Sequence, residues 1–173
     1  MKKEELLARL ALLELEGLGP VGAHALLSKF GSAEAVFNAK MHQILSVYRI
    51  SKKVAANIRN PVSAFKKAEK EVQFIEREAI EVIHLDDHHY PYKLAQCPDA
   101  PFILFSKGRV PTEKQRTVGI VGTRNISKYG KELVEELTDS LKNTGVWVVS
   151  GLAAGIDGEA HRLACLHGLP TLG

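Results

Sequence analysis

The sequence lacks the features of a secreted or membrane-spanning protein. Its cysteines, Cys97 and Cys165, have no CxxC spacing and indicate unpaired thiols in a reducing compartment rather than a disulfide framework. No apolar run approaches the roughly 18 residues that a membrane span needs. The acidic start, Met1–Glu5, does not match a signal peptide. We therefore expect a cytoplasmic protein with no membrane segment.

The chain also has a small net charge and few aromatic residues. The net charge of the 173 residues is +3, which is compatible with nucleic acid but does not require it. Aromatic residues make up 6% of the chain, so the sequence shows no stacking platform for bases. If DNA binds, contacts to its phosphates should therefore dominate. Apolar residues, at 45%, are sufficient to form a packed core in one ordinary domain or two small ones.

The common nucleotide-binding and catalytic motifs are missing as well. The dinucleotide fingerprint GxGxxG does not occur, and Ser150 stands where an NAD site has an acidic residue at the end of the second strand. There is no Walker GxxxxGK[ST] sequence, and no Ser-His-Asp or Cys-His constellation is legible. A serine with an arginine nearby nevertheless suits the 2′-phosphate of NADP. A Rossmann-type nucleotide enzyme, NADP-dependent or phosphoribohydrolase-like, therefore stays open as an alternative.

Residues 1–61 have the pattern of a small all-helical domain. Apolar residues recur at helical spacing from Leu6 onward, and the segment Gly17–Pro20 interrupts them. Ser32 and Ser51 are suitable N-caps for later helices. The pattern predicts a compact bundle that ends at Asn60-Pro61.

Part of this region resembles a helix-hairpin-helix motif, from Leu15 to Leu27. Because Glu14 and Glu16 flank the hairpin, we favour a packing or protein-interaction domain over a phosphate site. The basic residues around the second helical pair could contact DNA nonspecifically, but a solvated helix face is the favoured interpretation; they are Arg49, Lys52, Lys53 and Arg59.

Residues 62–173 have the pattern of an α/β domain. A charged amphipathic helix is predicted over 62–78, and two short strands over 80–85 and 102–106, which could flank a larger sheet. From 118 to 167 the order is strand, helix, strand, helix, and 168–173 leads into another strand. The predicted fold is therefore a Rossmann-like doubly wound parallel sheet, incomplete at the C-terminus, after the helical domain. Because so few strands are present, we expect the chain to be the N-terminal part of a longer protein.

Two strands in this domain end in glycine, and this is the most informative feature of the sequence. The strands 118–122 and 146–150 end at Gly122 and Gly151, and consecutive parallel strands are usually neighbours. Glycine lets the backbone approach a ligand, and the amides at the following helix starts favour an anion. Arg124 adds a planar fork for phosphate oxygens. The sequence predicts an anion cradle that needs no metal and no cofactor.

Other residues near these loops have plainer interpretations. The hydroxyls of Thr123 and Ser150 are candidate donors to the same anion. Ala153 and Gly155 lie in the second loop and complete the candidate site, although Gly155 suits a tight turn better than a direct contact. Asp157 is expected to cap the helix that follows. A metal site is not expected, since no zinc motif accompanies the imidazoles of His84, His88 and His89.

With these residues in view, the chain resembles the DNA-processing protein A (DprA/Smf) family. The resemblance rests mainly on Gly122-Thr-Arg124, the pair Tyr129-Gly130, the string Ser150-Gly-Leu-Ala-Ala-Gly-Ile-Asp157 and Ala160-His-Arg162. Further matching segments are Asp87-His-His-Tyr-Pro91, Asp99–Gly108 and Leu18-Gly-Pro-Val-Gly22. The string at 150–157 is the most specific of these.

The resemblance implies a function that is not enzymatic. Members of this family bind single-stranded DNA through an extended Rossmann domain, help to load the RecA recombinase during natural transformation, and dimerise through that domain. It also implies that Arg124 and the loops at Gly122 and Gly151 hold backbone phosphates. A protein-binding scaffold that uses the helical start is a third interpretation.

Overall fold

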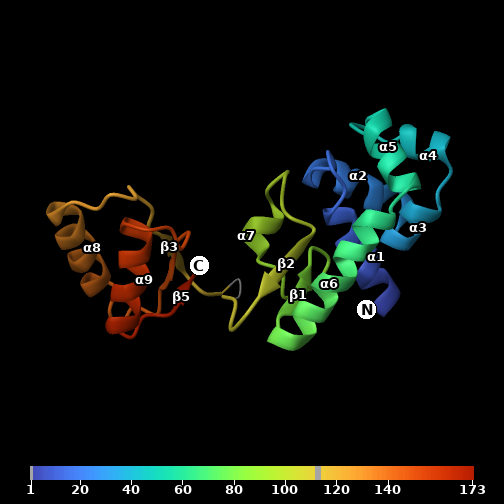
Figure 1. Cartoon of the computed structure of the whole chain (residues 1–173). Coiled ribbons are helices and arrows are strands. Elements are labelled where there is room, and N and C mark those ends of the chain that lie inside the picture. Colours follow the sequence, from blue (N-terminus) through green and yellow to red (C-terminus); the bar gives the residue numbers. More distant parts are fainter. Residues whose placement is uncertain (1, 112–113) are drawn as a thin grey trace. The chain divides into compact units, whose positions relative to one another are not determined.

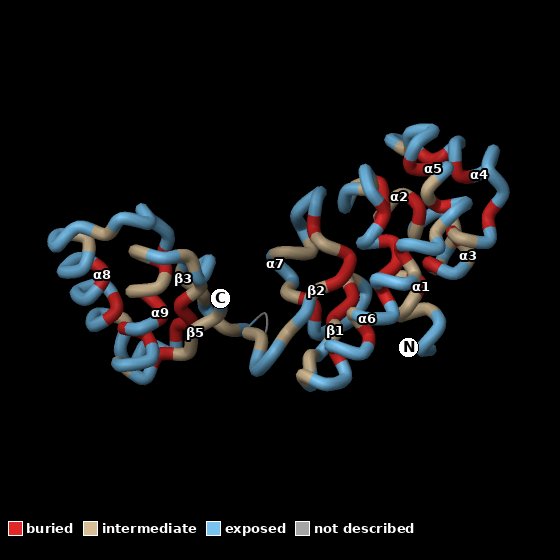
Figure 2. The backbone as a smooth tube through the Cα atoms, viewed as in Figure 1, coloured by how far each residue is buried: buried red, intermediate tan, exposed pale blue. Residues whose placement is uncertain are grey.

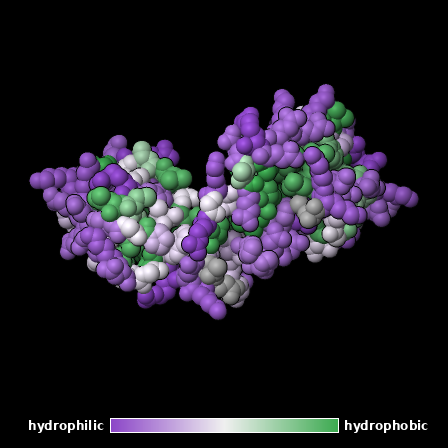
Figure 3. Space-filling model, turned by 90° about the horizontal axis from the view of Figure 1, so that it is seen from below, coloured by the Kyte–Doolittle hydropathy of each residue, from purple (hydrophilic) through white to green (hydrophobic). Residues whose placement is uncertain are grey.

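The computed structural model describes residues 2–111 and 114–173. The chain packs as two compact units, Met1–Gly108 and Arg109–Gly173, which are described separately below (Figure 1). The surface of each unit is mostly polar, with apolar patches between the polar side chains (Figure 3). Among the described residues, no helix has the length and apolar character needed to cross a bilayer.

The first unit begins with a series of helices whose ends follow the predicted signals. The helices are α1 (Lys3–Leu13), α2 (Pro20–Phe30), α3 (Ala33–Asn38), α4 (Met41–Leu45), α5 (Lys52–Arg59) and α6 (Val62–Glu78). The Ser32 hydroxyl accepts from Ala35 N–H, and the Ser51 hydroxyl accepts from Val54 N–H. Both predicted N-caps are thus confirmed.

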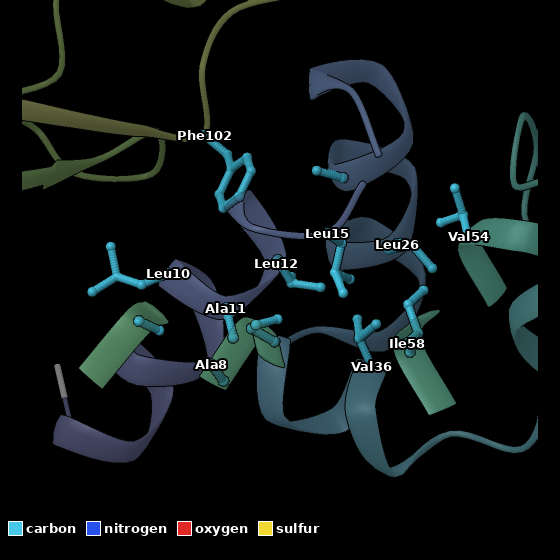
Figure 4. Close-up of a cluster of buried hydrophobic side chains, with 14 of the residues drawn as sticks. Ala8, Leu10, Ala11, Leu12, Leu15, Leu26, Val36, Val54, Ile58 and Phe102 are labelled. Carbon is cyan, nitrogen blue, oxygen red and sulfur yellow. The ribbon is translucent and has the colours of Figure 1, made fainter. Parts of the chain in front are cut away.

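The core of this unit is built from the inner faces of the helices. Leu10, Leu12, Leu26, Val36 and Ile58 are fully buried, and Figure 4 shows Leu12, Leu26, Val36 and Ile58 gathered between α1, α2, α3 and α5. Burial of each large aliphatic side chain contributes roughly 1.5–3 kcal/mol. These side chains therefore hold the first five helices together.

That core does not stop at the domain boundary predicted after residue 61. Helix α6 packs along α1, and its residues Ala68, Val72 and Ile75 belong to the same buried cluster. Asn60-Pro61 ends α5, but the apolar face of α6 packs against the helices before it. The chain divides into its two compact units after Gly108.

The two short strands predicted next are present but do not flank the larger sheet. Strands β1 (Glu81–His84) and β2 (Ile103–Ser106) pair antiparallel with each other, with Val82 opposite Phe105. Phe102 and Ile103 insert into the helical core. The segment between the strands also contains a short helix, α7 (Tyr92–Ala95), which the sequence did not predict.

The second unit is a parallel sheet with two helices. Its order is β3 (Thr117–Gly119), α8 (Lys128–Ser140), β4 (Trp147–Val149), α9 (Ile156–Leu166) and β5 (Thr171–Leu172). The strands lie in the order β3-β4-β5, all parallel. This confirms the predicted strand–helix–strand–helix–strand pattern.

The core of the second unit lies between this sheet and its helices. Val134 of α8, Val148 of β4 and Leu163 of α9 form one buried cluster, and α8 packs on α9. Because successive parallel connections are right-handed, both helices cover the same face of the sheet. Figure 2 shows buried segments on the strands and on the inner sides of the helices.

Candidate nucleic-acid interface at the sheet edge

The two glycine loops leave the same edge of the parallel sheet, as predicted. Gly119 lies opposite Val149 in the β3–β4 register, so both strands end at one level. The amide of Ile156 donates to the carbonyl of Thr123 at 3.1 Å, which joins the second loop to the first. The two loops, residues 120–127 and 150–155, therefore form one continuous surface beyond the ends of β3 and β4, which we call the lip.

Gly155 is the position where the loops press together. Its φ of +92° lies in the left-handed region, and a Cβ there would be 2.2 Å from the carbonyl oxygen of Thr123. No side chain fits that space, and the backbone angle also disfavours any L-residue. The prediction that Gly155 serves the turn is confirmed by this geometry.

Asp157 organises the lip, which is not the role predicted for it. The N-cap of α9 is Gly155, and the Asp157 side chain does not cap the helix. Its carboxylate, in a residue only 7% exposed, accepts from Gly122 N–H through Oδ1 and from Gly151 N–H through Oδ2, both at 3.2 Å. Asp157 thus bridges both loops from below.

This bridge changes the role of the two loop glycines. The amides of Gly122 and Gly151 were expected to face a phosphate, but both donate to Asp157. A Cβ on Gly122 would also lie 2.6 Å from Cγ1 of Ile156, so the missing side chain makes room for packing. These glycines allow the loops to pack closely, and their amides are not available to a ligand in this conformation.

Ser150 likewise points inward. It is 6% exposed, and its hydroxyl donates to the carbonyl of Ile120 at 2.6 Å. The expected donation to a phosphate is therefore not available from this conformation. The same bond weakens the NADP interpretation, which required this serine to meet the 2′-phosphate.

Thr123 and Ala153 hold the outer part of the lip. The Thr123 hydroxyl accepts from Asn125 N–H at 3.2 Å and so fixes a local turn. The carbonyl of Ala153 accepts from Gly158 N–H at 2.9 Å, which ties the second loop to α9. Between them lies Leu152, an exposed non-glycine residue with φ of +54°. Backbone strain of this kind is concentrated at binding sites.

Arg124 is the charge that this arrangement leaves free. It is exposed and, within the part of the chain that the structure describes, makes no hydrogen bond or ion pair. Arg162, in contrast, is held by Glu159 through two hydrogen bonds of 2.8 and 2.9 Å. That bond raises the pKa of Arg162 and lowers the pKa of Glu159. The lip therefore presents one unpaired guanidinium.

Main-chain amides remain available beside this guanidinium. In the described structure, the amides of Thr123, Arg124, Leu152 and Ala153 donate to no other residue. Amides and a guanidinium at the carboxyl edge of parallel strands are the donors that bind phosphate groups. Among the described residues, the free amides of the two loops are thus these four, while those of Gly122 and Gly151 are bonded to Asp157, and binding of an anion here stays a prediction.

The histidines are separate from this site. His161 is buried on α9, where its Nδ1 lies 2.7 Å from the Thr171 hydroxyl. Among the residues that the structure describes, no group of three or more His, Cys, Asp or Glu side chains is arranged to hold a metal ion.

The second unit is an α/β domain with a parallel sheet, and in its described part the loops carry an unpaired cation and free amides. Comparison with known families makes the class specific. The family described as DNA recombination-mediator protein A matches residues 81–173, and a SAM-like helix-hairpin-helix tandem matches residues 9–60. The chain belongs to the DNA recombination-mediator protein A family, which is the DprA/Smf family.

Individual relatives agree with this assignment. The chain is 35% identical over 139 residues to the DNA processing protein DprA of Bacillus subtilis, covering 79% of this chain and 46% of the relative. It is 31% identical over 164 residues to Protein Smf of Synechocystis, covering 91% of this chain and 40% of the relative. The chain thus spans less than half the length of these curated relatives.

A solved structure is also similar. The X-ray structure of DNA processing protein A from Streptococcus pneumoniae matches with a TM-score of 0.68 and 26% identity. The match covers 95% of this chain and 56% of that chain. The similarity in three dimensions therefore extends over nearly all of the chain described here.

Proposed function

We propose that this chain binds the phosphate backbone of single-stranded DNA with the lip around Arg124, as part of a DNA recombination mediator. The observation that carries the proposal is the exposed guanidinium of Arg124, unpaired among the described residues, on a loop that is hydrogen-bonded to the second loop. Membership in the recombination-mediator family supports DNA as the polyanion. The single-stranded preference comes from the resemblance to that family.

In the proposed mode of binding, one phosphate lies over the lip. Arg124 contributes the charge and two parallel donors, and the amides of Thr123 and Ala153 contribute neutral donors. Gly122, Gly151 and Gly155 allow the loops to adopt this shape, while Ser150 and Asp157 fix them from below. Because the contacts go to phosphate, we expect little sequence preference and a strong dependence on salt.

The wider role is proposed from the family. The protein would deliver single-stranded DNA to the RecA recombinase in natural transformation, act as a homodimer through the α/β domain, and work in the cytoplasm. It would do so by binding and not by catalysis. We further propose that residues 62–173 belong to one functional domain and that β3-β4-β5 form part of a doubly wound Rossmann-like sheet.

A binding titration tests the central claim. In filter binding, the unaltered chain should bind labelled single-stranded oligonucleotide tightly, and Arg124→Ala should bind about 10-fold to 30-fold more weakly. One charge-assisted phosphate contact contributes about 1.5–3 kcal/mol before the competing interaction of the arginine with water is subtracted. Arg162→Ala is the matched control, since that arginine is already paired with Glu159. NADP should not displace the oligonucleotide.

Two outcomes would contradict the proposal. Equal affinity of Arg124→Ala and the unaltered chain would remove Arg124 from the site. Competition by NADP at the affinity expected of a cofactor would instead support the nucleotide-enzyme interpretation.

A further inference from the structure

The helical part of the first unit contains a long tract without carboxylates. From Ala35 to Ala68 the sequence has no aspartate or glutamate. The cations of this tract are Lys40, Arg49, Lys52, Lys53, Arg59, Lys66 and Lys67. Such one-sided charge in a chain of nearly balanced composition points to a surface that meets a polyanion.

Several of these cations are already occupied by other parts of the unit. Lys53 pairs with Glu16 at 2.6 Å, and Lys67 pairs with Glu14 at 3.0 Å. Arg59 donates to the carbonyl of Ala39 at 3.2 Å. Arg49 and Lys52, by contrast, are exposed and have no ion pair among the residues that the structure describes.

These two free cations lie at the hairpin between α4 and α5. Val47 is buried and Ile50 half-buried, so the hairpin is anchored to the core on both sides of its tip. The tip itself, Tyr48-Arg49, is exposed, and Arg49 has a φ of +63°. Arg49 thus belongs to a hairpin tip, not to the solvated helix face that the sequence pattern indicated.

The tip combines an aromatic ring with positive charge. Tyr48 is 73% exposed, and Cζ of Arg49 lies 5.4 Å from its ring centroid. Lys29 reaches the base of the hairpin, where its Nζ donates to the Ser46 hydroxyl at 2.5 Å. The amides of Tyr48 and Arg49 donate to no other described residue. The tip therefore carries cations, free amides and an open ring face.

We propose that the hairpin tip formed by Tyr48, Arg49 and Lys52 is a second contact for single-stranded nucleic acid, independent of the Arg124 lip. Phosphates would meet Arg49 and Lys52, and an unpaired base would stack on Tyr48. Stacking on an aromatic ring tolerates every base, so the contact would add affinity without adding sequence preference. This inference goes beyond the proposed function, which places binding in the second unit alone.

The experiment is a fluorescence anisotropy titration of the full chain with a labelled oligothymidine. Tyr48→Ala should weaken binding about 10-fold, whereas Tyr48→Phe should bind as the unaltered chain does, because stacking needs only the ring. Arg49→Ala should lower the slope of log affinity against log salt by about 0.7, the value for one contact to a single strand. Lys70→Ala, an exposed lysine between two glutamates, is the control.

Each variant is also combined with Arg124→Ala, so that the two sites can fail separately. Loss of affinity from the hairpin variants alone would support the tip and refute the Arg124 lip. Loss from Arg124→Ala alone, with the hairpin variants equal to Lys70→Ala, would overturn the inference and leave the proposed function in place. An additive loss would support both sites.

Two further measurements keep the result unambiguous. Thermal unfolding of the hairpin variants should match that of the unaltered chain, because Tyr48 and Arg49 are exposed. Cross-linking of an iodouracil-substituted strand should label the peptide that contains Tyr48. Binding to vesicles with anionic headgroups that depends on Tyr48, without any effect on oligonucleotide binding, would overturn the inference in favour of a lipid surface.

Discussion

Each unit of this protein contains a carboxylate that satisfies two main-chain amides, but the two carboxylates differ in their countercharge. In the first unit, Glu5 accepts from the amides of Ala33 and Glu34 at the start of α3 and from Arg9 at 2.7 Å. In the second, Asp157 accepts from the amides of Gly122 and Gly151 and has no cation partner in the described structure.

The difference separates a structural network from the proposed binding site. Arg9 is 12% exposed in its side chain and also contacts Asp86, so its charge is consumed within the fold. Arg124 is exposed and keeps its charge for a ligand. Because Asp157 accepts hydrogen bonds only from main-chain amides, it can fix the two loops without neutralising the charge of Arg124.

The largest effect should come from removing Glu5. Glu5→Ala leaves Arg9 largely buried without its nearest carboxylate and uncaps α3, so the free energy of unfolding should fall by about 3 kcal/mol. Urea denaturation measures this, with Glu4→Ala, an exposed neighbour, as the control. A loss no greater than that of the control would show that the network contributes nothing to stability.

The next effect concerns Asp157. Asp157→Asn keeps one acceptor but cannot serve both loop amides, so stability should fall by about 1–2 kcal/mol. Because the lip loses its order, affinity for single-stranded DNA should fall as well, although the residue has no expected contact with DNA. Lower stability with unchanged affinity would show that the lip does not depend on this bridge.

Acid should weaken the contribution of the Glu5 network to stability. Burial alone would raise the pKa of Glu5 and of Asp86, but their hydrogen bonds outweigh it and the pKa of each lies below its ordinary value. A lowered folded-state pKa contributes stability that is complete above the unfolded-state value and is lost as pH falls through the folded-state value. The difference in unfolding free energy between the unaltered chain and Glu5→Gln should therefore shrink below about pH 4, from the ordinary pKa of glutamate. A difference that stays constant between pH 7 and 3 would contradict this.

The smallest effect should come from changing the shape of the free cation and keeping its charge. Arg124→Lys retains attraction for a phosphate but loses the planar fork, so affinity should fall about threefold with the salt slope unchanged. Anisotropy titrations at several salt concentrations measure both quantities. A loss as large as that of Arg124→Ala would mean that geometry, not charge, dominates the contact.

Much of this arrangement follows from the sequence, because its signals are local. Residue type and spacing are enough to recognise the helix starts at Ser32 and Ser51 and the strands before Gly122 and Gly151. They also indicate the exposed Arg124. The bridge by Asp157 is not, because the same position also suits a helix cap, and only the meeting of two loops selects the other role. The packing of α6 on α1 and the inward turn of Ser150 likewise depend on contacts between residues far apart in the chain.

The exposed tip at Tyr48 is a related case. A composition of 6% aromatic residues argues against a base platform, but a single ring suffices if its neighbours on both sides are anchored. Val47 and Ile50 supply those anchors. The number of aromatic residues cannot reveal the exposed ring of Tyr48, because its exposure depends on the burial of the residues on either side of it.

The close approach at Gly155 has a mechanical consequence. A Cβ at Gly155 would overlap the carbonyl oxygen of Thr123, and the amide of Ile156 donates to that same carbonyl, so we expect the two loops to move together. If DNA binds at Arg124 as proposed, a pull on the strand would be shared between β3 and β4 and would not act on a single loop.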